Sequence, residues 1–223
     1  MLAPDLKRRI LAAAASEASP TRRQRVVGSA IRAVSALAVP LLLFTLVGGV
    51  RLAPRPLGLV VMTALGTSIV AAWALFAAFG RGPSMLGRTR GWLLGTAVIA
   101  PLAFLIWKVA ASSGVPHMMD AWPTRPGLRC FAVTALFAAW PLVALGWERW
   151  GSDPVHPRAL GLALGVAAGA SAAVLVDLWC PVGHVPHLLT GHVAPMLLLG
   201  GLGALVGTRV LGVQAGRSPA PLP

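Results

Sequence analysis

The chain has 223 residues, of which 57% are hydrophobic and 11% are charged, with a formal net charge of +13 and a mean hydropathy of +0.77. Soluble domains contain roughly 45–50% apolar and about 25% charged residues, so the composition excludes an ordinary soluble fold. The arginines lie between apolar runs and form no single basic face, and we therefore expect no direct contact with nucleic acid. We predict an all-α membrane protein.

The N-terminal segment, residues 1–32, contains acids, prolines and scattered arginines and does not resemble a secretory signal. Within it, PDLKRRILAAAASEA follows a helical pattern in which Leu6, Ile10 and Leu11 share one stripe beside basic residues. A basic amphipathic helix is typical of segments that bind a partner or a membrane surface. An ordinary positively charged anchor is the alternative. The helix is predicted to break at Ser19-Pro20, after which the chain runs into the first span.

Six apolar runs follow, each long enough for a spanning helix, which needs about 20 residues. Because every backbone polar group must be satisfied in hydrocarbon, we predict helices rather than loops. The runs occupy 33–50, 56–80, 91–107, 130–147, 159–176 and 178–208. In the sixth run, the apolar part begins near Val193. The predicted organisation is a cytoplasmic segment (1–32), a six-helix bundle (33–212) and a disordered cytoplasmic tail (213–223).

The distribution of basic residues predicts the orientation. With the N-terminus inside, 14 of the 19 Lys and Arg residues fall in cytoplasmic segments and 5 fall outside. Positive residues are retained on the cytoplasmic side, so both termini are predicted to be cytoplasmic. Small residues also recur at helical spacing. Gly161, Gly165 and Gly169 on the fifth predicted helix, and Gly203 and Gly207 on the sixth, form rows that favour close helix packing.

Both cysteines and most histidines fall on the predicted outer edge. Cys130 begins the fourth predicted helix and Cys180 ends the fifth. The neighbouring polar residues are His117, Asp120, Asp177, His184, His187 and His192. Three interpretations remain open: small apolar thiols beside solvated histidines, a reversible thiol pair or disulfide, and a soft metal site. Asp177, close to a span end, needs a partner for its charge.

The predicted inner loops, 81–90 and 148–158, are too short for a catalytic domain, and no phosphate loop, HExxH or GxSxG motif is present. We therefore expect neither an enzyme nor a cofactor. Glu148 and Asp153 stand among arginines, which predicts a local ionic arrangement in that loop. A small transporter or metal permease is the alternative function, although the chain shows neither internal repeats nor charges deep within the spans.

Four stretches carry a resemblance to a known family. They are DLKRRILAA before the first span, PGLRC at 126–130, WGSDPVHPR at 150–158 and VDLWCP at 176–181. Together with the length and the number of spans, they resemble the NrsF-type membrane anti-sigma factors, including a CarR-like myxobacterial branch linked to carotenogenesis. The resemblance extends over roughly residues 5–212.

The resemblance implies a multi-pass inner-membrane protein that sequesters an extracytoplasmic-function sigma factor. A metal, oxidative or light and singlet-oxygen stress would release the sigma factor. The resemblance links two cysteines to sensing, which here are Cys130 and Cys180. The residues that would bind the sigma factor lie in the cytoplasmic N-terminal segment and are Asp5, Leu6, Arg8, Arg9, Ile10 and Leu11.

Overall fold

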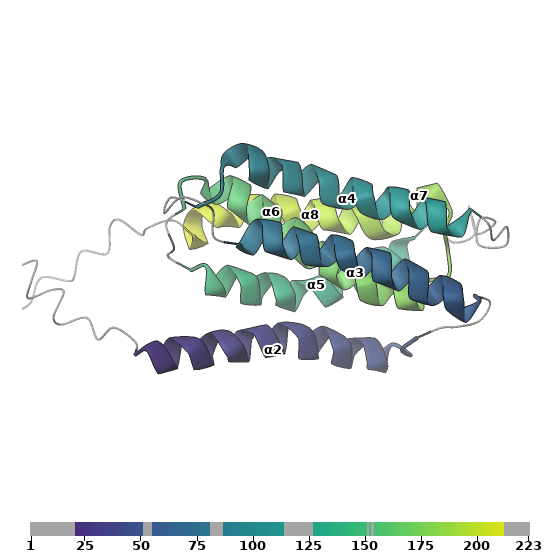
Figure 1. The fold of residues 1–223 in the computed structure, drawn as a ribbon, viewed down its shortest axis with the longest axis horizontal. Helices are drawn as coiled ribbons and strands as arrows, with labels where there is room; N and C mark the ends of the chain where they lie inside the picture. The colour runs from purple at the N-terminus through teal and green to yellow at the C-terminus, as the bar shows by residue number, and fades with distance from the viewer. Residues whose placement is uncertain are drawn as a thin grey trace, which may run out of the picture.

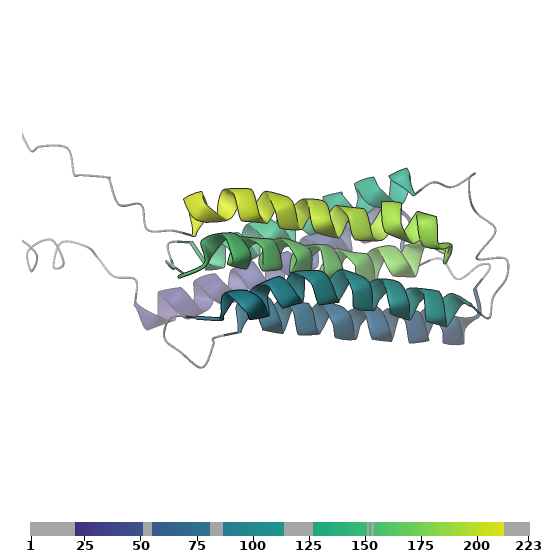
Figure 2. The same cartoon turned by 90° about the horizontal axis from the view of Figure 1, so that it is seen from above.

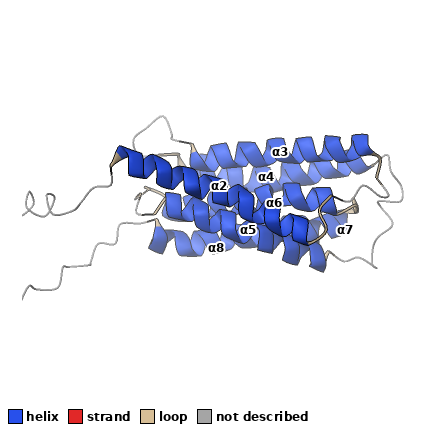
Figure 3. Ribbon diagram, turned by 90° about the horizontal axis from the view of Figure 1, so that it is seen from below, coloured by secondary structure: helices blue, strands red, loops and turns tan. Residues whose placement is uncertain are grey.

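A computed structural model describes residues 21–50, 55–80, 87–113, 127–150, 152 and 154–211. All the regular structure in these ranges is helical (Figures 1 and 3). The elements are α2 (Arg22–Leu46), α3 (Leu57–Phe79), α4 (Arg90–Ser112), α5 (Leu128–Glu148), α6 (Pro157–Trp179), α7 (Val185–Leu188), the π-helical turn η2 (Leu189–Val193) and α8 (Ala194–Val210). Residues 1–20 and 213–223, for which a helix and a tail are predicted, lie outside the described residues.

Among the described residues, six helices are long and apolar enough to cross a membrane, which confirms the predicted number of spans. The last span is continuous from Val185 to Val210, because α7, η2 and α8 follow one another without a break. The helix α2 begins at Arg22, well before the apolar run, because Thr21 and Gln24 form a capping box. In that arrangement each side chain accepts a hydrogen bond from the other residue's backbone, which satisfies amide groups that a helix start leaves open.

The six spans do not share burial equally. α6 lies at the centre of the bundle, is largely buried and packs against α3, α4, α5 and α8 (Figures 1 and 2). α2 lies at the periphery, has few buried residues and packs mainly on α5. Its exposed apolar residues, which include Ile31, Val34 and Leu37, suit contact with lipid. The bundle therefore combines a tightly held centre with one peripheral helix attached along a single neighbour.

The two ends of the bundle carry different features. The start of α2 and the end of α8 lie at one end, which we call the terminal end (Figure 1). The end of α6 and the short helix α7 lie at the opposite end, which we call the cysteine end. An even number of spans requires this arrangement of the termini. Which end faces the cytoplasm stays a prediction based on the basic residues.

The glycine rows lie where α6 and α8 pack against each other. A Cβ atom at Gly161 would collide with the backbone carbonyl of Gly203, and one at Gly165 with that of Leu199. At Gly169 the nearest atom to such a Cβ would be the Cα atom of Met196, at 2.8 Å. The predicted small-residue packing is thus confirmed, and it brings the two backbones into direct contact.

Candidate functional site

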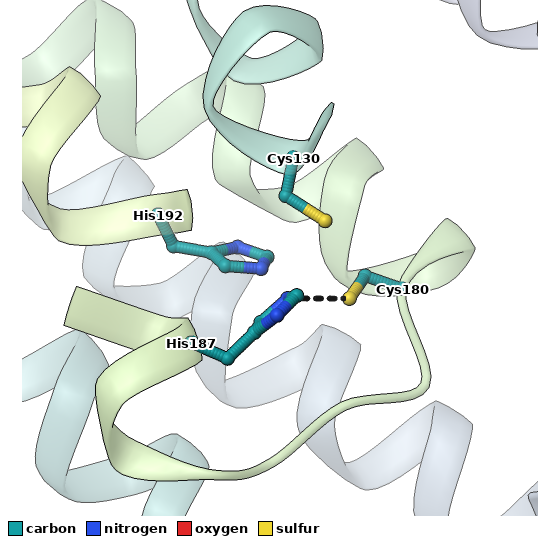
Figure 4. Close-up of side chains that lie close together, drawn as sticks. All are labelled: Cys130, Cys180, His187 and His192. Carbon is teal, nitrogen blue, oxygen red and sulfur yellow. Dashed lines mark hydrogen bonds between the residues drawn. The ribbon is translucent and has the colours of Figure 1, made fainter. Parts of the chain in front are cut away.

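Four potential metal ligands come together at the cysteine end (Figure 4). Cys130 lies in the first turn of α5, Cys180 follows α6 as its C-cap, His187 belongs to α7 and His192 to η2. One ligand atom from each residue lies within 4.8 Å of the ligand atoms of the other three. All four side chains are buried, with exposed fractions of 4%, 2%, 3% and 0% in the same order. We call these four residues the Cys/His cluster.

Two glycines allow α5 to begin beside η2. Gly127, immediately before α5, has a φ of +92°, a conformation that costs little for glycine and is strained for other residues. A Cβ atom at Gly191 would lie only 3.0 Å from the Cβ atom of Cys130 and from the carbonyl oxygen of Gly127. The Thr134 hydroxyl also donates a hydrogen bond to the Gly191 carbonyl, at 3.3 Å. This close approach brings Cys130 to the histidines.

The π-helical turn explains how the two histidines share one face. His187 and His192 are five residues apart, and in a regular α-helix such residues point about 140° away from each other. The wider turn at Leu189–Val193 absorbs the extra residue, so the two ring centroids lie 5.8 Å apart. Single π turns inside α-helices are frequent at functional sites. The spacing suggested no metal motif in the sequence, since the signal lies in the backbone geometry.

Hydrogen bonding within the cluster is incomplete. The Cys180 sulfur lies 3.2 Å from Nε2 of His187. A hydrogen bond from Cys130 holds the pKa of the Cys180 thiol well below its usual range, against the opposing effect of burial, and the two imidazoles act in the same direction as Cys130. Neither ring nitrogen of His192 has a hydrogen-bond partner of ordinary geometry among the described residues, although the ring stacks on Phe104 at 5.7 Å. A buried polar ring in this condition normally costs free energy.

A buried ion pair lies next to the cluster. Asp177, for which the sequence required a partner, contacts Lys108 of α4, and both side chains are completely buried. Arg55 donates hydrogen bonds of 2.7 Å to the carbonyl oxygens of Asp177 and Leu178, close to the end of α6. A cation there satisfies open carbonyls and interacts favourably with the helix dipole. Lys108 was not identified from the sequence as the partner of Asp177, although opposite charges near the same end of two apolar helices were a usable signal.

Other predicted site residues lie elsewhere. His184 precedes α7 as its N-cap and is not a member of the cluster. His117 and Asp120 fall outside the described residues. The residues predicted to bind the sigma factor, which lie in the segment from Asp5 to Leu11, also fall outside them.

At the terminal end, Glu148 joins α5 to α2. Its carboxylate accepts a hydrogen bond from Ser29 and forms an ion pair with Arg32, whose Nε lies 2.6 Å from Oε2. The sequence predicted a local ionic arrangement for Glu148, whereas its hydrogen-bond and ion-pair partners lie on α2. The reason is that α2 and α5 pack side by side, which the loop sequence alone does not reveal. We call these three residues the α2–α5 latch.

Over its described residues, the fold is a bundle of six candidate spans with a thiol and imidazole cluster buried at one end. A family model described as "Negative regulator of sigma F" (NrsF) matches residues 11–212. The chain belongs to the NrsF family, and it is thus a negative regulator of a sigma factor. No curated protein and no solved structure matches the chain.

Proposed function

We propose that this protein is a non-enzymatic, inner-membrane anti-sigma factor that sequesters an extracytoplasmic-function sigma factor through its cytoplasmic N-terminal segment. A stress signal received at Cys130 and Cys180 would release the sigma factor. Membership of the NrsF family carries the proposal. The predicted orientation supports it, because it gives the thiols to the outer side and the basic N-terminal segment to the cytoplasm.

A single helix, α5, connects the thiols with the helix that carries the N-terminal segment. α5 carries Cys130 in its first turn and Glu148 as its last residue, so this one helix runs from the Cys/His cluster to the α2–α5 latch. α2 in turn follows directly on residues 1–20. A displacement of α5 at the cysteine end would therefore bear on the helix that carries the N-terminal segment.

Energetically, the switch requires two bundle states that differ in affinity for the sigma factor. A tenfold loss of affinity corresponds to about 1.4 kcal/mol of coupling. That amount is within the range of typical allosteric coupling energies, which are about 1–3 kcal/mol.

Deleting residues 2–20 tests the proposal while leaving the Thr21 cap and α2 in place. We expect constitutive activity of a promoter that depends on the partner sigma factor, with the truncated protein still in the membrane fraction. Deleting residues 213–223 provides a control of the other terminus and should preserve repression. Full repression by the protein that lacks residues 2–20 would contradict the proposal. The alternative of a metal permease requires metal uptake into proteoliposomes containing the protein.

The α2–α5 latch makes a second prediction. Glu148→Gln removes the charge that holds Arg32, but the pair is partly exposed, so the loss should be below about 1 kcal/mol. We expect basal reporter expression to change by no more than about fivefold. Arg32→Gln should have a similar effect, and the double variant should be no worse than either single variant, because one interaction is removed in all three. Additive effects would contradict the role of the latch.

A further inference from the structure

We propose that Cys130, Cys180, His187 and His192 bind one soft divalent cation of the zinc class in a tetrahedral site. The cation would join the start of α5, the end of α6 and the start of the last span. Its effect on repression rests on the function proposed above, whereas binding itself does not.

The distances suit tetrahedral coordination. Metal–sulfur bonds of about 2.3 Å and metal–nitrogen bonds of about 2.0–2.1 Å place tetrahedral ligand atoms roughly 3.3–3.8 Å apart. The Cys180 sulfur and Nε2 of His187 lie 3.2 Å apart, and no pair among the four ligand atoms exceeds 4.8 Å. Small rotations of the side chains would bring all four to bonding distance, with no movement of a helix.

The donor set selects a soft cation. Thiolate and imidazole suit zinc and similar metals, whereas magnesium and calcium require oxygen ligands. The nearby carboxylate of Asp177 is paired with Lys108 and is not one of the four ligands. On binding, the cation forms two bonds to sulfur and two to nitrogen; both sulfur atoms bind as thiolates, and any proton that a thiol still carries leaves to solvent. Two thiolates then balance the charge of a divalent ion, so the occupied site is neutral overall, as its burial requires.

The burial and the incomplete hydrogen bonding of His192 point independently to a ligand. Its side chain is completely buried, and neither of its nitrogens has a hydrogen-bond partner of ordinary geometry among the described residues. A metal bond would use one of these nitrogens. Phe104, stacked on the ring with an interplanar angle of 23°, limits its orientation. A disulfide between Cys130 and Cys180 is the competing use of the same sulfur atoms. A disulfide would give the His192 nitrogens no new bonding partner.

The test uses the full-length protein, purified in detergent under reducing conditions without added metal. We expect about one equivalent of metal by elemental analysis. After chelation, titration with Co²⁺ should produce thiolate charge-transfer bands and the strong visible absorption of tetrahedral cobalt. X-ray absorption of the zinc-loaded protein should show two sulfur and two nitrogen neighbours, which tests the site without any substitution.

Substitutions then assign the ligands. Cys180→Ser and His192→Gln should each weaken Co²⁺ binding by more than the roughly 10–100-fold that loss of an outer-shell contact causes. His184→Gln is the matched control, since this histidine lies close in sequence but outside the cluster, and it should leave affinity unchanged. Oxygen-only coordination, absence of stoichiometric metal, or recovery of the purified protein as a Cys130–Cys180 disulfide would each overturn the site.

A separate measurement distinguishes the site from the proposed function. The partner sigma factor is co-purified with the protein before and after chelation. Metal binding without any change in co-purification would remove the regulatory link and leave the site intact. Retention of the sigma factor by a protein that binds no metal would remove the site and leave the anti-sigma function intact.

Discussion

Lys108→Met is expected to destabilise the bundle by about 3–5 kcal/mol, because it leaves Asp177 without its cation in a completely buried position. An isolated charge there is far more costly than a buried pair. Asp177→Leu should have an effect of the same size, since it leaves the ammonium group of Lys108 without its carboxylate partner. The free energy of unfolding can be measured for purified protein in mixed micelles with increasing denaturing detergent.

The double variant Lys108→Met, Asp177→Leu separates an uncompensated charge from lost packing. Removing both charges together should restore most of the stability, because replacement of a buried pair by apolar residues is often neutral. Ile106→Met on α4 is the matched control, since its side chain is 67% exposed, and it should cost little. A double variant as unstable as the sum of the single variants would show that the charges are not coupled.

Gly203→Val is the second large perturbation. The Cβ atom alone would collide with the Gly161 carbonyl, so α6 and α8 would have to separate. Overpacking typically costs about 1–3 kcal/mol and occasionally more, and rigid backbone on both sides places this position at the upper end. The unfolding midpoint in the same detergent titration should fall accordingly.

Gly201→Val provides the control on the same helix. A Cβ atom at Gly201 would meet nothing within 4 Å, so the substitution should change stability by less than about 1 kcal/mol. Equal effects at Gly201 and Gly203 would mean that helix propensity, rather than the contact of α6 with α8, determines the loss.

Much of the architecture could be predicted from the sequence because lipid imposes simple requirements. Long apolar runs must be helical, and each of the six predicted runs overlaps one of the six spans found among the described residues. Small residues at a four-residue spacing predicted close packing for two helices, and the structure shows that these helices, α6 and α8, pack against each other at those residues. The number of spans also placed Cys130 and Cys180 at the same end, where the structure brings them together.

The missing information was three-dimensional. His187 and His192 share a face only because η2 widens one turn, and no hydropathy pattern predicts such a turn. The partner of Asp177 is 69 residues away in sequence, on α4, and that of Glu148 is 116 residues away, on α2. Pairings of this kind depend on which helices are neighbours, and the order of spans along the chain does not specify that.

The enclosure of the Cys/His cluster also limits how quickly a metal ion or another reagent can reach it. Because all four side chains are buried, an incoming reagent gains access only when the surrounding helix ends separate transiently. The frequency of these openings sets an upper limit on the rates of both arrival and departure. A brief exposure would leave most copies unmodified, and a copy once modified would stay so after the surroundings had returned to normal. If the cluster receives the signal as proposed, it would average its environment over time.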